Sequence, residues 1–293
     1  MKKVLIAIIV IVALMTGSLL YYLPSLNETF LETITHLPID EKNKFLNANT
    51  SINLINQNDE DEYTLEWKTN SEIDEKLSIS HDISLLFEDG RLKETLAKTK
   101  QNSNELDQTA KIAGEDSGHY EAITFHYGQL DYPNDIKKSV QTMSYDQIYI
   151  LDSPLSTIEF FKSPKSPSEE EGKRVLDTII KQNLEYTWEE LIDFFEINIK
   201  NYHSVPLTSL YEYNYLSLPN ITMEETQEMV AYTWTSLYQH YFLGIQKYDG
   251  KTVSPIGSSV PLILYHNTYS HIIIVFTSKD GEKYHLIRNT ERF

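Results

Sequence analysis

The sequence predicts an α+β protein that has an N-terminal transmembrane helix, then a mainly β region, a helical middle and a C-terminal antiparallel β-hairpin or meander. Three observations predict this: an uncharged opening segment, short alternating apolar runs over residues 63–162, and helical apolar spacing from residue 163 followed by strand-like runs. Because strands and helices occur in separate groups, antiparallel sheets are favoured over repeated βαβ units.

The opening segment, residues 4–23, contains no charged residue. A helix rises about 1.5 Å per residue, so this segment matches the bilayer's hydrocarbon thickness of about 30 Å. Lys2 and Lys3 precede it, which places residues 1–3 in the cytoplasm and the rest outside the cell membrane. The alternative is a cleaved signal peptide and a secreted protein. The apolar run continues past Thr16–Ser18, a poor cleavage site, so a retained single-pass signal anchor is favoured.

Composition limits the partners and cofactors. The chain has 25 basic and 43 acidic residues, a net charge of −18, and no cysteine. The acidic balance argues against nucleic acid, and the lack of cysteine excludes disulfides, thiolate metal sites and thiol catalysis. No cofactor and no oligomeric state are indicated. Residues 24–62, rich in Asn, Thr and acidic residues, are predicted to form a solvated stalk. Residues 63–162 and 163–293 form either two domains or one.

The β region begins with short runs at 63–67, 76–80 and 83–87, and Asp89-Gly90 predicts a hairpin turn. The segment RLKETLAKTK, from Arg91, has helical spacing. Residues 119–127 and 147–151 alternate as strands.

The helical middle begins after SPKSPSEEE, residues 163–171, where Ser166 with Glu169, or Ser168 with Glu171, offers a capping box. Apolar residues then recur at helical spacing, and Thr187–Glu190 offers a second capping box. These signals predict a helical hairpin.

A third helix is predicted from Thr222, capped with Glu225, to Gly250. Its apolar stripe contains Val230, Trp234, Leu237, Tyr241, Ile245 and Tyr248. Residues 260–265 and 272–277 are typical of buried strands, and a tight turn at 278–281 predicts a return strand over 283–288.

Catalytic motifs for nucleotide-binding loops, zincins, α/β-hydrolases and penicillin-binding proteins are missing from the sequence. No catalytic residue and no metal ligand is therefore predicted, and a non-enzymatic role is favoured.

One weak polar site is predicted in the segment GEDSGHYEAITFH, residues 114–126. Asp116, His119 and Glu121 would lie at the mouth of a loop, while strand alternation puts His126 on the opposite face. An ordinary turn followed by a strand is the favoured interpretation. Near the carboxyl end, His266 and His271 would face each other across a short turn.

A second weak site is predicted in LYEYNYLSLP, residues 210–219. In an extended segment Tyr211, Tyr213 and Tyr215 would share one face and could stack on sugar rings or grip a peptide. Packing of these rings on the neighbouring helices is the competing and favoured interpretation.

These observations favour a membrane-anchored extracytoplasmic protein, which acts as a non-enzymatic binding or regulatory module at the cell envelope. Its partners would be the membrane, through residues 4–23, and an envelope protein or a carbohydrate or peptide ligand. Two alternatives stay open. One is an envelope hydrolase whose carboxylates and histidines are assembled only by the fold, and the other is a membrane-tethered subunit that docks on another membrane protein.

Overall fold

The computed structural model describes residues 34–57, 62–153, 156–247 and 250–290. The described part is mixed, with about 51% strand and 25% helix, and its sheets are antiparallel. None of the helices in this part has the length and apolar character needed to cross a bilayer. The predicted anchor, residues 4–23, lies outside the described residues.

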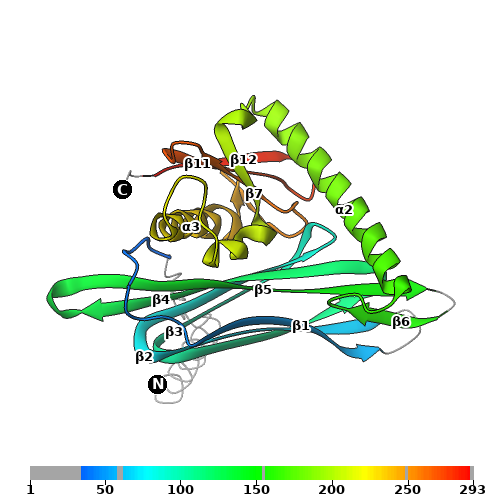
Figure 1. The fold of residues 1–293 in the computed structure, drawn as a ribbon, viewed down its shortest axis with the longest axis horizontal. Coiled ribbons are helices and arrows are strands. Elements are labelled where there is room, and N and C mark those ends of the chain that lie inside the picture. Colours follow the sequence, from blue (N-terminus) through cyan, green and yellow to red (C-terminus); the bar gives the residue numbers. More distant parts are fainter. Residues whose placement is uncertain (1–33, 58–61, 154–155, 248–249, 291–293) are drawn as a thin grey trace, which may run out of the picture. The chain divides into compact units, whose positions relative to one another are not determined.

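A large six-stranded sheet comes first in the chain (Figure 1). Its strands are β1 (Asn47–Gln57), β2 (Tyr63–Glu88), β3 (Arg91–Gly114), β4 (Gly118–Tyr132), β5 (Ile136–Ser153) and β6 (Ser156–Phe161). The order is β1-β2-β4-β5-β6, and β3 pairs with the other edge of β2. The β4–β5 connection is a short 3-10 turn, η1 (Pro133–Asp135).

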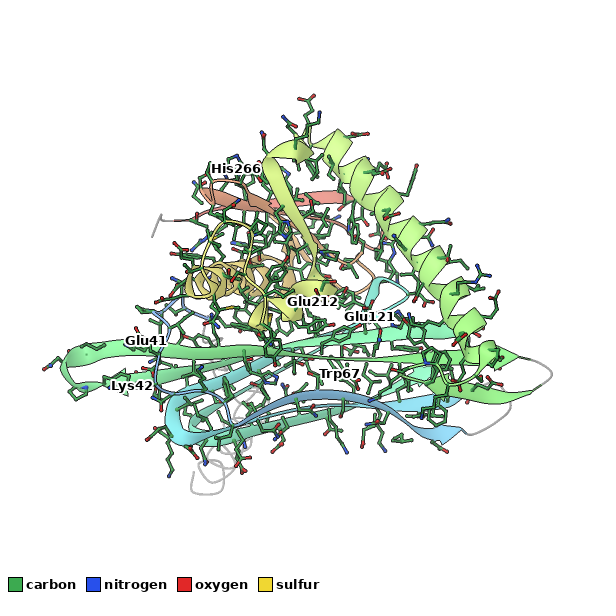
Figure 2. The ribbon with its side chains drawn as sticks, in the orientation of Figure 1. Glu41, Lys42, Trp67, Glu121, Glu212 and His266 are labelled. Carbon is green, nitrogen blue, oxygen red and sulfur yellow. The ribbon has the colours of Figure 1, made fainter. Side chains whose placement is uncertain are left out.

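The large sheet folds back on itself because β2 bends. Residues 63–72 of β2 pair with β1, whereas residues 79–88 pair with β4, and the pairing with β3 shifts register between Glu72 and Leu77. The two halves therefore form two layers that share a core, with Trp67 fully buried between them (Figure 2). Burial of one such large side chain contributes about 1.5–3 kcal/mol.

Two predictions for this region are wrong. Residues 47–57 form β1, which is hydrogen-bonded along β2, so this part of the predicted stalk is a strand of the sheet. Residues 91–100 lie in β3 rather than in a helix. Asp89 and Gly90, both with positive φ, form the predicted hairpin turn, and the long pairing with β2 overrides the weak helical spacing.

The second half of the chain packs on one face of the large sheet (Figure 1). It contains α2 (Pro167–Phe194), α3 (Met223–Leu237), a π-helical turn η4 (Tyr238–Phe242) and the 3-10 helices η2 (Ile199–Asn201) and η3 (Leu207–Asn214). Its small sheet has the order β12-β11-β10-β7 and comprises β7 (Tyr202–Pro206), β10 (Leu262–His266), β11 (His271–Thr277) and β12 (Lys283–Asn289). The strands β8 (Ile245–Gln246) and β9 (Thr252–Val253) pair with each other as an antiparallel two-stranded ribbon.

Helix α2 is one continuous helix, so the predicted helical hairpin is wrong. Ser166 caps it by accepting a hydrogen bond from the Glu169 N–H, as predicted. The Thr187 hydroxyl donates to the Asn183 carbonyl within the helix and does not cap a second one. Since no proline or glycine lies between Gly172 and the helix end, nothing in the chain interrupts it.

Helix α3 and the C-terminal strands follow the sequence prediction closely. Thr222 and Glu225 form the predicted capping box. The predicted apolar stripe is buried from Val230 to Ile245, although the helix ends at η4 and not at Gly250. The C-terminal meander is confirmed, and His285 lies opposite Val275 as the hairpin register requires.

Candidate functional site

A cavity of about 500 Å³ lies beside the edge of β5. This volume falls in the range of about 300–1,000 Å³ that is usual for small-molecule sites. We call it the strap pocket, because one wall is the segment that precedes β1, residues 34–46, which we call the strap. Other walls come from β5, from the end of η3 and from α3.

The strap is fastened to β5 and to α3. The Asp40 N–H donates to the Ser139 carbonyl at 2.7 Å, and the Ser139 N–H donates to the Pro38 carbonyl at 2.9 Å. His36 stacks on Tyr232 with ring centroids 3.9 Å apart and lies 3.0 Å from a Glu228 carboxylate oxygen. The strap therefore has a defined position along the β5 edge.

Asp40 shapes the strap wall of the pocket. Its carboxylate accepts hydrogen bonds from the Lys42 and Asn43 N–H groups and from the Tyr132 hydroxyl. Burial acts to raise the pKa of Asp40, but these hydrogen bonds outweigh it and the pKa lies below its ordinary value of 3.8. The carboxylate is thus occupied by the strap and by Tyr132 of β4, and its role is to hold the loop that carries Asn43 and Lys44.

Asn214, the last residue of η3, fastens the opposite wall. Its side-chain amide donates to the Met143 carbonyl at 2.7 Å and accepts from the Met143 N–H at 3.1 Å. The amide thereby replaces the peptide group of a neighbouring strand. Between Ser139, which the strap pairs, and Met143, which Asn214 pairs, Gln141 lines the pocket. Its side-chain carbonyl is buried without a hydrogen-bond partner among the described residues.

The three predicted tyrosines do not share one face, because their segment is a 3-10 helix and not an extended strand. Tyr211 stacks on Tyr145 at 4.3 Å, away from the pocket. Tyr213 and Tyr215 line the pocket; Tyr213 is hydrogen-bonded to His203, whereas Tyr215 is 81% exposed. The structure therefore brings two of the three to one site, together with Phe45 and Asn214, which the sequence did not indicate.

The predicted polar site is divided by the structure. His119 and Glu121 share the face of β4 beneath the second half of the chain, with Nδ1 and Oε2 3.9 Å apart. His119 stacks on Tyr149, and Glu121 accepts a hydrogen bond from Tyr145. Asp116 instead offers its backbone carbonyl to the Tyr63 hydroxyl.

The side chains around His119 and Glu121 form buried polar contacts with Tyr145 and Tyr149. Burial, together with the Glu121 carboxylate, raises the pKa of Tyr145 far above its ordinary value, so this phenol stays protonated at neutral pH. Within the described residues, no group of three or more His, Cys, Asp or Glu side chains is placed to hold a metal ion. The predicted facing of His266 and His271 is seen, since their rings stack 4.7 Å apart.

His126 lies on the opposite face of β4, inside the folded large sheet, in a row of hydrogen-bonded polar side chains that we call the polar seam. The polar seam comprises Thr50, Ser71, Asp82, Ser84, Thr124, His126 and Ser144. No local sequence pattern indicates the polar seam, because its members come from four strands, β1, β2, β4 and β5.

Part of the polar seam has the composition of a Ser-His-Asp triad. His126 Nε2 lies 2.7 Å from Ser144 Oγ, and His126 Nδ1 lies 3.0 Å from Asp82 Oδ2. However, neither Nδ1 nor Oδ2 has a hydrogen bond of acceptable geometry, and both side chains are fully buried. Ser144 also shares its hydroxyl with Thr50 at 2.6 Å. A catalytic triad needs the imidazole–carboxylate hydrogen bond and a nucleophile open to substrate, so this arrangement favours a structural role.

No family model matches this chain, and neither the curated proteins nor the solved structures contain a match to it. The function is therefore argued from the strap pocket and its surroundings.

Proposed function

We propose that the protein is a single-pass, membrane-anchored binding module that acts at the cell envelope without catalysis, and that the strap pocket is its ligand site. The observation that carries this proposal is the pocket itself. It combines an exposed ring, Tyr215, with polar side chains that include the partly exposed amide of Gln227. Concave sites with a few placed polar groups and an aromatic ring are typical of ligand binding.

We infer that the chain after residue 23 lies outside the cell, because Lys2 and Lys3 precede the apolar segment and keep its N-terminal end in the cytoplasm. Protease treatment of intact cells tests this part. Digestion of the part after residue 33, while a cytosolic control protein survives, is expected. Protection of the whole chain in intact cells, with digestion only after lysis, would contradict it.

Ligand binding is tested by ligand-detected NMR on the full chain in nanodiscs, with a panel of blocked tripeptides and neutral trisaccharides. At least one class is expected to bind the wild type and to bind Tyr215→Ala at least about tenfold more weakly. Tyr186→Ala is the matched control, because Tyr186 is 70% exposed on α2, an element that does not line the pocket. Equal binding by all three proteins would refute the pocket as the site.

A rival function, envelope hydrolase, has one observation in its favour, namely the grouping of Ser144, His126 and Asp82. A fluorophosphonate probe separates the two functions, because it modifies only an activated serine. Labelling of Ser144 that disappears in His126→Ala would favour the hydrolase. Burial of the imidazole and carboxylate leads us to expect no labelling above that of the Ser144→Ala protein.

A further inference from the structure

We propose that the ligand of the strap pocket is a neutral glycan, held by amide side chains and by stacking on Tyr215. This inference rests on the proposed function and adds the chemical class of the ligand. It is carried by the composition of the pocket wall, by the backbone hydrogen bonds already made at the β5 edge and by the net charge of the chain.

Amide side chains dominate the polar wall of the pocket. The lining amides belong to Asn43, Asn47, Gln141, Asn214 and Gln227, and the charged residues of the lining are Asp40 and Lys44. The first four amides each make hydrogen bonds to neighbouring protein groups, which leaves Gln227 as the lining amide most open to a ligand. An amide offers both a donor and an acceptor, which matches a sugar hydroxyl that also does both. The Gln141 carbonyl oxygen is itself buried. The side-chain amide of Gln227 is partly exposed in the pocket lining, so it is the amide that we expect to exchange hydrogen bonds with a ligand hydroxyl.

An aromatic surface lies beside these amides. Tyr215 presents most of its ring to solvent, and Phe45 and Leu46 extend the apolar surface on the strap wall. A sugar ring has one apolar C–H face and a polar rim, so it suits a site with an aromatic ring on one side and amides on the other.

The β5 edge argues against a peptide as the ligand. Peptides that bind a sheet edge add a strand through hydrogen bonds at successive alternate residues. Here the backbone N–H and C=O groups of Ser139 are bonded to the strap, and those of Met143 are bonded to the Asn214 side chain. Of the alternate residues at this edge, only Gln141 lies between them. An added strand cannot extend in either direction without displacing a wall of the pocket.

Charge argues for a neutral ligand. The chain carries a net charge of −18, which repels polyanions at long range. Within the pocket lining the Asp40 carboxylate is hydrogen-bonded by the strap and by Tyr132, so Lys44 is the charged lining residue that remains to face a ligand. One exposed lysine gives no fixed, paired recognition of a carboxylate or phosphate.

The experiment is isothermal titration of the full chain in nanodiscs with three probes: an N-acetylglucosamine trisaccharide, cellotriose and blocked trialanine. At least one saccharide is expected to bind, with Tyr215→Ala weakening binding at least about tenfold, Gln227→Leu at least about fivefold, and Tyr186→Ala leaving it unchanged. Circular dichroism spectra that match the wild type show that the variants are folded.

Three results would overturn the inference, and they separate it from the proposed function. Tyr215-dependent binding of trialanine without saccharide binding would refute the glycan class and leave the pocket as a binding site. Saccharide binding that is equal in all variants would place the glycan elsewhere. Binding of none of the three probes would refute the inference, and the wider NMR panel would then decide whether the pocket binds anything.

Discussion

Asn214 is the side chain on which the pocket's far wall depends, and its replacement gives the sharpest prediction. Asn214→Ala removes two hydrogen bonds to the Met143 peptide groups, at 2.7 and 3.1 Å. At a net value of about 1 kcal/mol each, their loss lowers the free energy of unfolding by about 2 kcal/mol. In a unit of this size, 1 kcal/mol shifts Tm by about 2–4 °C, so Tm is expected to fall by about 4–8 °C.

The assay is thermal unfolding of the full chain followed by near-ultraviolet circular dichroism. Asn183→Ala is the matched control, because Asn183 is exposed on α2, and it should change stability by no more than about 0.5 kcal/mol. Asn214→Leu keeps the side-chain size and should lose as much stability as Asn214→Ala. If both Asn214 variants melt within about 1 °C of the wild type, the amide does not hold η3 on β5 and the account of the pocket wall is wrong.

Two further predictions concern buried histidines. Burial lowers the pKa of His81 from its ordinary 6.5 to about 4, with Asp82 acting in the opposite direction. The unfolded chain therefore gains a proton below pH 6.5 that the folded chain takes up only near pH 4, so stability should fall by about 3 kcal/mol across this window. Urea titrations of His81→Phe should lack most of that fall, and a profile like that of the wild type would contradict the burial argument. His126→Ala removes the hydrogen bond to Ser144 and leaves a cavity beside the buried Asp82 carboxylate, which should cost about 2–5 kcal/mol in the same assay, against less than about 0.5 kcal/mol for His240→Ala on the surface.

The elements that were predictable are those whose local signals agree with their tertiary contacts. The Thr222–Glu225 capping box starts α3, and the turn at 278–281 joins β11 to β12 in the expected register. The region 63–88 was read as three short strands, yet it forms the single strand β2. Its length comes from pairing with β3 over two layers, and such long-range pairing has no local sequence signal.

The candidate site was predictable only in part, for a similar reason. Tyr213 and Tyr215 were found from their alternate spacing, but the extended geometry assigned to them was wrong because the segment up to Asn214 is a 3-10 helix. Asn43, Gln141 and Asn214 come from three segments far apart in the chain, and only the fold brings them together around the strap pocket. The polar seam was missed because each of its strands contributes one or two ordinary polar residues.

Photoaffinity mapping shows whether a bound saccharide occupies the strap pocket. A diazirine-bearing derivative of a saccharide that binds in the titrations would be irradiated with the full chain in nanodiscs, and the labelled peptides identified by mass spectrometry. Labels within residues 43–48 and 213–216, which competing unmodified saccharide removes, are the predicted result. Competed labels confined to α2 or to the outer face of the small sheet would contradict binding in the strap pocket.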